Sequence, residues 1–276
     1  MEFGTTVGVS GAIGIATAAW WRTKHRWLRD RRYAELTSRQ SDVTGQYPVA
    51  LASTLPDPAE LAKTFVQERI AGISGFLDAG TLAEMQSEGL NTRLNMERSF
   101  IPLHKQGSTL SYEKVIQFAP HSWSFYCSRN VTQWLERLTG VPMRQTPIQD
   151  QSSLSLLCYE KEGDHIQWHY DHNFYRGPHF TVLLALINRG ASGGLTQSVF
   201  QRQRPDGGIE EFTTTENALI VFEGATVRHR ATPAAAGDLR LILSMTYCAD
   251  PRISWFKEAA RRIKDTAFFG IRALWD

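Results

Sequence analysis

Residues 153–171 read SLSLLCYEKEGDHIQWHYD, in which two short apolar runs are separated by the turn-forming residues KEGD. Further runs of this kind follow at regular spacing: FTVLLALIN at 180–188, LTQSVFQ at 195–201, ALIVFEG at 218–224 and LRLILSMTYC at 239–248. Between the second and third of them, RPDGG at 204–208 is a strong hairpin turn. Short strands separated by turn residues at such spacing predict an all-β sandwich or barrel.

His169 and Asp171 lie two residues apart on one of these predicted strands. The period-two geometry of a strand points both side chains to the same face, where an imidazole nitrogen and a carboxylate oxygen offer two adjacent ligands. His229, at the start of a later strand pair, could add a third ligand. Two histidines and one carboxylate on one face form the facial triad of non-haem iron(II) sites, which leaves three coordination positions open.

The sequence around these ligands contains six features in a characteristic order. They are Tyr159, the triplet His169-Tyr170-Asp171, the run TVLLALIN from Thr181 to Asn188, Gly193-Gly194-Leu195-Thr196, His229 and the basic residue Arg240. With them, the stretch from Tyr159 to Tyr247 resembles the catalytic core of the 2-oxoglutarate-dependent oxygenases, in particular their prolyl-hydroxylase-like branch. The resemblance implies an α+β fold with a double-stranded β-helix core of the jelly-roll or cupin type. N-terminal helices and a C-terminal helix would flank that core.

The resemblance also implies roles for individual residues. His169, Asp171 and His229 would bind iron(II). Arg240 would pair with the distal carboxylate of 2-oxoglutarate, because a guanidinium meets a carboxylate with two hydrogen bonds. Tyr159 would donate a hydrogen bond to the same co-substrate, and the alternative is a tyrosine of the core. Dioxygen would be the second co-substrate, and the reaction would hydroxylate a C–H bond while 2-oxoglutarate is decarboxylated to succinate.

Three departures from the pattern bear on the substrate. Leu195 stands where the prolyl-hydroxylase-like branch usually carries an acidic residue, and Arg240 lies one residue further from His229 than expected. Ile242 occupies the serine position of the Arg-x-Ser pattern found in another branch. These departures put a prolyl substrate in doubt. Asp171 favours hydroxylation or desaturation over halogenation, because related halogenases lack this carboxylate.

The loop after Asp171 is expected to line the substrate entrance, because functional residues concentrate on loops held by a rigid scaffold. Arg176 and Asn173 on this loop are the predicted substrate contacts, with Arg176 for an anionic part of the substrate. The neighbouring His165, His172 and His179 are interpreted as structural residues, with His179 a candidate for the pocket. The substrate would be either a lipid or other amphiphilic small molecule, or a peptide side chain.

Two rival functions use a similar set of ligands. The first is a non-catalytic, membrane-tethered metal-binding barrel that acts as a sensor or scaffold, but such a protein needs neither Arg240 nor Tyr159. The second is a zinc hydrolase, which requires a positioned general base, and the sequence contains no HExxH motif. Both rivals therefore explain fewer of the residues than the oxygenase does.

The N-terminal part of the chain divides into three expected segments. Residues 1–36 combine a charge-free stretch at 3–21, which ends in two tryptophans, with a basic stretch at 22–32. Such a segment predicts a short membrane anchor with the bulk of the protein on the cytoplasmic side. A helix packed on the protein or a loose tail is the alternative. Residues 37–58 are expected to be a linker, and residues 59–250 the oxygenase domain.

Helices are predicted at both ends of that domain. Asp57 is expected to cap a helix that begins with Pro58, and Gly140 to end the helix NVTQWLERLTG. At the other end, residues 251–276 form a predicted amphipathic helix. Its apolar face consists of Phe256, Ala260, Ile263, Ala267 and Leu274. This helix is expected either to pack on the domain or to lie on an anionic membrane surface.

Composition excludes some other classes of function. The formal charge of +2 over 276 residues gives no basis for binding nucleic acid. The three cysteines are widely spaced without a CxxC pair, which favours a reducing compartment over a disulfide framework. The expected partners are therefore a small-molecule or peptide substrate and a membrane.

Overall fold

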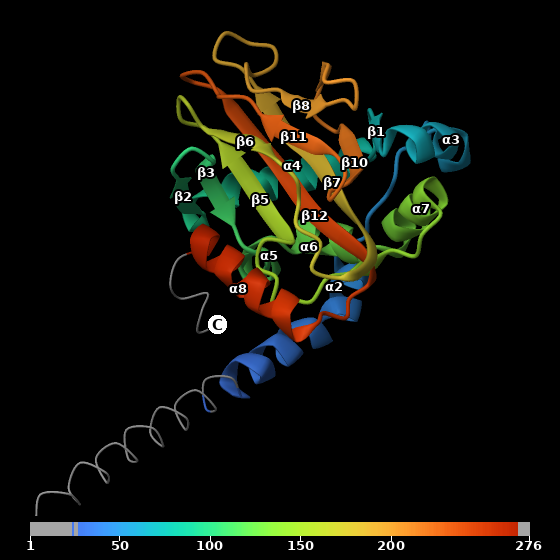
Figure 1. Ribbon diagram of the computed structural model, residues 1–276, viewed down its shortest axis with the longest axis vertical. Helices are drawn as coiled ribbons and strands as arrows, with labels where there is room; N and C mark the ends of the chain where they lie inside the picture. Colours follow the sequence, from blue (N-terminus) through green and yellow to red (C-terminus); the bar gives the residue numbers. More distant parts are fainter. Residues whose placement is uncertain (1–23, 25–26, 270–276) are drawn as a thin grey trace, which may run out of the picture.

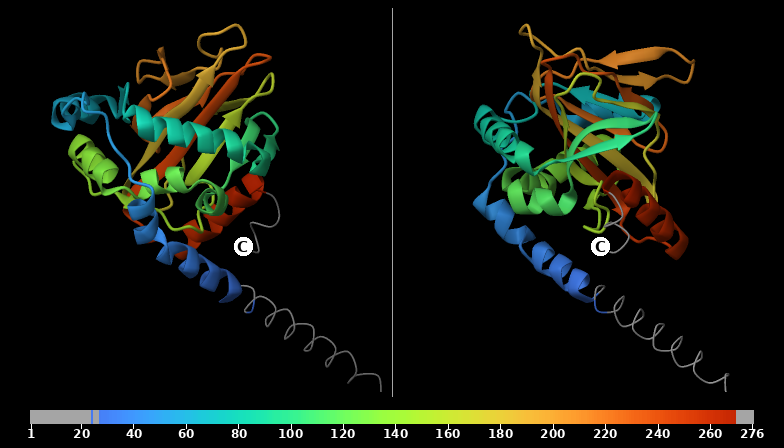
Figure 2. Two further views of the ribbon diagram at one scale, coloured as in Figure 1. Left: turned by 180° about the vertical axis from the view of Figure 1, so that it is seen from behind. Right: turned by 90° about the vertical axis from the view of Figure 1, so that its left-hand side faces the viewer.

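The computed structural model describes residue 24 and residues 27–269, and Figures 1 and 2 show its arrangement. Residues 27–38 are helical. The further helices are α2 (Gln40–Gln46), α3 (Pro58–Glu68), α4 (Ala79–Asn91), the 3-10 helix η1 (Thr92–Asn95), α5 (Tyr112–Phe118), α6 (Pro120–Cys127), α7 (Arg129–Thr139) and α8 (Trp255–Phe269). The strands are β1 (Ile70–Ile73), β2 (Glu97–Ile101), β3 (Lys105–Leu110), β4 (Arg144–Gln145), β5 (Leu154–Tyr159), β6 (His165–His169), β7 (Arg176–Arg189), β8 (Phe200–Gln203), β9 (Ile209–Phe212), β10 (Leu219–Glu223), β11 (Arg228–Ala231) and β12 (Leu239–Asp250).

The strands form a nearly closed, antiparallel jelly roll. Their order is β1-β10-β7-β12-β5-β3-β6-β11-β8-β9. The strands β1, β10, β7, β12 and β5 make one wall, and β6, β11, β8 and β9 make the other. Strand β3 pairs with both β5 and β6 and joins the two walls. The predicted α+β fold with a double-stranded β-helix core is therefore confirmed.

Strand β12 illustrates how the sequence pattern builds the two sides of a wall. Leu241, Leu243 and Met245 are buried in the main hydrophobic core, together with residues of the helices. The alternate residues Arg240 and Ser244 face the opposite way and line a cavity between the walls. One strand thus supplies apolar side chains to the core and polar side chains to the cavity, as the period-two geometry of strands requires.

Helices cover the outer face of the first wall, where α4 crosses the strands (Figure 2, left). A Cβ at Gly89 of α4 would lie 2.4 Å from a methyl group of Leu241, so only glycine allows this close packing. Asp57 caps α3 by accepting from Ala59 N, and Gly140 ends α7 in the left-handed conformation. Both sequence predictions are confirmed.

The described residues begin within the predicted N-terminal segment. The predicted anchor stretch, residues 3–21, lies outside the described residues. Within the described part of the chain, no helix has both the length and the apolar character needed to cross a membrane. The segment predicted as a linker, residues 37–58, contains α2, whose Val43 is buried in the main core.

Helix α8 packs with its charged side inward. Arg261 and Asp265 are almost completely buried, whereas Phe256 and Ile263 are more than half exposed. Among the described residues, the predicted apolar face of this helix therefore points away from the domain. The reason is a buried ion-pair network that takes the inward side: Arg261 pairs with Asp265 and Glu258.

Candidate metal centre and cavity

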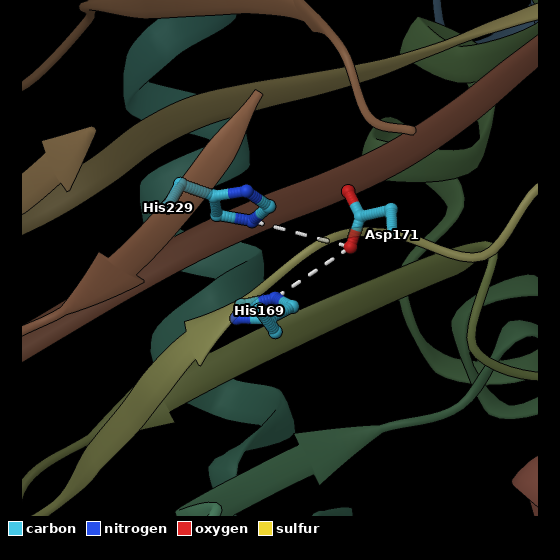
Figure 3. A group of neighbouring side chains, drawn as sticks. All are labelled: His169, Asp171 and His229. Carbon is cyan, nitrogen blue, oxygen red and sulfur yellow. Dashed lines mark ion pairs between the residues drawn. The ribbon is translucent and has the colours of Figure 1, made fainter. Parts of the chain in front are cut away.

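Three side chains converge between the two walls (Figure 3). His169 ends β6, His229 lies in β11, and the two are direct partners in the antiparallel register. Asp171 follows β6, and its Oδ1 lies 3.6 Å from His169 Nε2 and 4.0 Å from His229 Nε2. One ligand atom of each residue lies within 4.8 Å of the other two. The structure thus brings together all three predicted ligands.

Hydrogen bonds aim these ligands at a common point. His169 Nδ1 lies 2.7 Å from Gln167 O, and His229 Nδ1 lies 3.0 Å from Val227 O. A backbone carbonyl accepts only from a protonated Nδ1, which leaves the Nε2 lone pair of each ring free to bind a metal. Thr181 Oγ1 donates to Asp171 Oδ2 at 2.5 Å and leaves Oδ1 facing the histidines.

The charges of the triad suit a divalent cation. Burial would raise the pKa of Asp171, but the two histidines and Thr181 outweigh it and hold this pKa far below its usual value. Burial lowers the pKa of His229 to about 4, against the opposing effect of Asp171. At neutral pH the carboxyl is therefore ionised and His229 is neutral, which are the states that bind metals.

Arg240 and Tyr159 lie side by side on neighbouring strands, as Cα partners of β12 and β5. The Arg240 Cζ atom lies 5.7 Å from the centroid of the Tyr159 ring. Arg240 is only 2% exposed, and its Nε has no hydrogen-bond partner among the described residues. Burial raises the pKa of Tyr159 to about 12, so its hydroxyl remains a donor. A buried guanidinium with an unused donor fits a carboxylate ligand.

A cavity of about 210 Å³ connects these groups. The triad, Arg240 and Tyr159 all line it. Arg176 and Asn173, the predicted substrate contacts, are not among its lining residues. Arg176 is exposed, and Asn173 closes a turn by donating to Gly177 O and accepting from Tyr175 N. Neither residue therefore lines the cavity that contains the triad.

Other residues that line the cavity escaped sequence analysis. They are polar side chains from four elements: Lys105 of β3, Ser155 of β5, Ser244 and Thr246 of β12, and Lys264 of α8. The alternation of β5 and β12 carried a usable signal, because Ser155 and Ser244 share a face with Tyr159 and Arg240. Lys264 carried none, since nothing in the sequence places α8 against the cavity.

Comparison with known proteins identifies solved structures with a similar fold. No protein-family model matches the sequence, and no curated protein was found to be similar to it. Solved structures do match. The α-ketoglutarate-dependent epimerase SnoN from nogalamycin biosynthesis is 15% identical, with a TM-score of 0.57 over 69% of this chain and 80% of SnoN.

Two prolyl hydroxylases match to a similar extent. The prolyl-4-hydroxylase of Pseudomonas putida is 13% identical, with a TM-score of 0.55 over 69% of this chain and 97% of its own. The Trichoplax adhaerens enzyme was solved with a peptide fragment of hypoxia-inducible factor. It is 13% identical, with a TM-score of 0.56 over 73% of this chain and 91% of its own. The chain therefore has the fold of the 2-oxoglutarate- and iron(II)-dependent oxygenases, including prolyl hydroxylases.

Proposed function

We propose that this protein is an iron(II)- and 2-oxoglutarate-dependent dioxygenase that hydroxylates a C–H bond of its substrate. The observation that carries the proposal is that one cavity is lined both by a buried guanidinium and by a His-Asp-His triad. A non-catalytic metal-binding barrel needs the triad but has no use for Arg240. Arg240 Nη1 donates to Ser198 Oγ at 3.5 Å, but the guanidinium has no acidic partner among the described residues. Burying such a charge is costly, so we infer that an anionic ligand compensates it.

Each residue then has a defined task. His169, Asp171 and His229 would hold the iron, and Arg240 would bind the distal carboxylate of 2-oxoglutarate with Tyr159 beside it. When bound, iron(II) and 2-oxoglutarate supply the activation of dioxygen, which yields succinate, carbon dioxide and one hydroxyl group on the substrate. The walls of the jelly roll would exclude water and fix the substrate near the metal.

The fold shared with these oxygenases supports iron(II) and 2-oxoglutarate as the cofactor and the co-substrate. Arg240, Tyr159 and the triad match the residue types that the sequence pattern of these oxygenases requires. Among the neighbours, one acts within nogalamycin biosynthesis and another was solved with a peptide. A lipid or other amphiphilic small molecule and a peptide side chain both remain as proposed substrates.

The test is an anaerobic titration of the metal-free protein with iron(II) and 2-oxoglutarate, followed by visible spectroscopy. Chelation of iron(II) by a 2-oxo acid gives a weak charge-transfer band. We expect this band in the wild type, its loss in His169→Ala and its weakening in Arg240→Ala. A folded wild-type protein that gives no band would refute the proposal and favour the non-catalytic barrel.

We also propose that the protein associates with a membrane, with its catalytic domain on the cytoplasmic side. Trp255, Phe256 and Ile263 form an outward apolar face on α8 and are 85%, 57% and 69% exposed. The side chain of the basic residue Arg252, just before α8, is 72% exposed and pairs with Asp250. Aromatic and basic side chains together favour an anionic lipid surface.

Sedimentation with lipid vesicles tests this association. The full chain should sediment with vesicles that contain phosphatidylglycerol, and Phe256→Glu together with Ile263→Glu should weaken this binding. Ile209→Glu on the β8–β9 hairpin is the control, because Ile209 is as exposed as Phe256, at 57%. The hairpin itself lies far from α8 (Figure 1). Equal binding by all variants would refute a role for α8.

A further inference from the structure

The cavity contains buried polar groups that the proposed function does not use. His179 of β7 lines the cavity and is only 1% exposed. Neither of its ring nitrogens has a hydrogen-bond partner among the described residues. Histidines in a protein core almost always have such partners, because an unsatisfied buried polar atom is costly. His179 therefore lacks the contacts that a purely structural histidine would have.

Two serines extend this unsatisfied surface. Ser155 of β5 and Ser244 of β12 are direct cross-strand partners, and both line the cavity. Within residues 27–269, the structure assigns no hydrogen bond to either hydroxyl. Ser153 differs sharply: it accepts from Thr146 Oγ1 at 2.6 Å and donates to Asp150 O at 2.7 Å. Ser153 lines the same cavity, so facing the cavity does not by itself leave a hydroxyl without a partner.

These groups lie on the metal side of the cavity, away from Arg240. A Cβ at Gly224 would lie 2.7 Å from Asp171 Cβ and 2.8 Å from His179 Nε2, so the His179 ring stands close to the triad. Along β12, Ser244 is four residues beyond Arg240, which corresponds to about 13 Å of strand.

Helix α8 supplies the edge of this region. Lys264 lines the cavity, and its Nζ lies 3.1 Å from Asp150 Oδ1. Asp150 is itself a buried lining residue. An ion pair therefore borders the same part of the cavity that contains His179 and the two serines.

We propose that the metal side of the cavity binds a small polar molecule, or the polar part of a larger one, through His179, Ser155 and Ser244. A hydrocarbon chain in this position would leave the imidazole and both hydroxyls buried without partners, whereas a polar ligand satisfies them. The inference rests on the proposed function, since it treats this region as the substrate side. It selects polar substrates over the acyl chain of a lipid.

The first test compares thermal stability in the full-length protein without added substrate. Ser153→Ala removes a satisfied hydroxyl and should lower Tm by about 2 to 4 °C. Ser155→Ala and Ser244→Ala remove unsatisfied hydroxyls and should leave Tm unchanged or higher. If Ser155→Ala and Ser244→Ala lower Tm as much as Ser153→Ala, the hydroxyls have structural partners and the proposal is overturned.

The second test measures succinate formation by the protein loaded with iron(II) and 2-oxoglutarate. The free L-amino acids and hexoses serve as polar probes, and fatty acids and alcohols of six to ten carbons serve as apolar probes. We expect only a polar probe to accelerate succinate formation. In His179→Leu this acceleration should be at least about tenfold smaller. Acceleration by a fatty acid that persists in His179→Leu would overturn the proposal. If no probe acts, the stability comparison decides.

The anaerobic charge-transfer band keeps the two proposals apart. If the wild type gives no band, the oxygenase function is refuted. The Tm values of Ser153→Ala and Ser155→Ala would still show whether the cavity hydroxyls lack structural partners. The presence of the band together with unfavourable stability results would leave the oxygenase function intact and refute the polar substrate side alone.

Discussion

Gly224 shows how one residue without a side chain can set the geometry of the triad. A Cβ at this position would lie 2.7 Å from Asp171 Cβ and 2.9 Å from Thr181 Oγ1, closer than side chains approach one another. Asp171 also donates its backbone N–H to Gly224 O. The contact is with the metal ligand and with the hydroxyl that orients it, so a larger residue has to displace one of them.

We therefore expect Gly224→Ala to weaken iron(II) binding by roughly 10- to 100-fold, as losses of ligand support do elsewhere. Anaerobic competition with a chelator measures this affinity. Gly45→Ala in α2 is the matched control, because no atom lies within 4 Å of the added Cβ. Unchanged affinity in Gly224→Ala would show that Asp171 does not depend on this contact.

Burial of a single residue, Lys105, should make the stability of the protein depend on pH. It is almost completely buried, and burial lowers its pKa from 10.5 to about 8. Between these two values the unfolded chain binds more protons than the folded protein, so the free energy of unfolding rises with pH across this window. Across the whole window, the free energy of unfolding rises by about 3 kcal/mol.

Denaturation by urea at pH 7.5 and at pH 10 tests this dependence. At pH 7.5, Lys105→Met should be more stable than the wild type. Between pH 7.5 and pH 10, its free energy of unfolding should rise much less than that of the wild type. Lys114→Met is the control, since this lysine is partly exposed and pairs with Glu97. If the free energy of unfolding of Lys105→Met rises with pH as much as that of the wild type, other titratable groups cause the dependence.

At the scale of elements, α8 is held by charges instead of apolar packing. Arg261 is buried, pairs with Asp265 and Glu258 and donates to Gln149 O. Arg261→Leu should destabilise the protein by roughly 3–5 kcal/mol, because it leaves Asp265 buried without its main partner. Hydrogen exchange of α8 should accelerate in the same variant.

Arg262→Leu provides the comparison within one helix. Arg262 also pairs with Glu258, but it is part-exposed, and loss of such a pair costs at most about 1 kcal/mol. If both variants exchange equally fast in α8, the inward network does not hold the helix.

The strands were predictable from the sequence, whereas the orientation of α8 was not. The period-two pattern places His169 and Asp171 on one face, and the turn residues mark the strand ends. An amphipathic pattern, in contrast, identifies two faces of a helix without stating which is inward. That choice depends on Asp150, which is more than 100 residues away in the sequence. The same limit applies to His179, whose lack of partners emerges only when β7 and Gly224 come together.

At the scale of the whole molecule, the jelly roll places the triad and Arg240 in one cavity, so ligand binding and folding are coupled. Any ligand that binds only the folded state raises stability, by about 2.7 kcal/mol at 100 times its Kd. For a protein of this size that corresponds to roughly 5 to 10 °C in Tm. Iron(II) should raise Tm through the triad, and 2-oxoglutarate should add a second increment through Arg240.

Anaerobic calorimetry of the wild type and two Arg240 variants separates these increments. Arg240→Ala should keep the increment from iron(II) and lose most of that from 2-oxoglutarate. Arg240→Lys should keep an intermediate part, because an ammonium retains the charge without the two-pronged geometry. If 2-oxoglutarate stabilises all three proteins equally, the co-substrate does not reach Arg240, and the buried guanidinium must serve another anion.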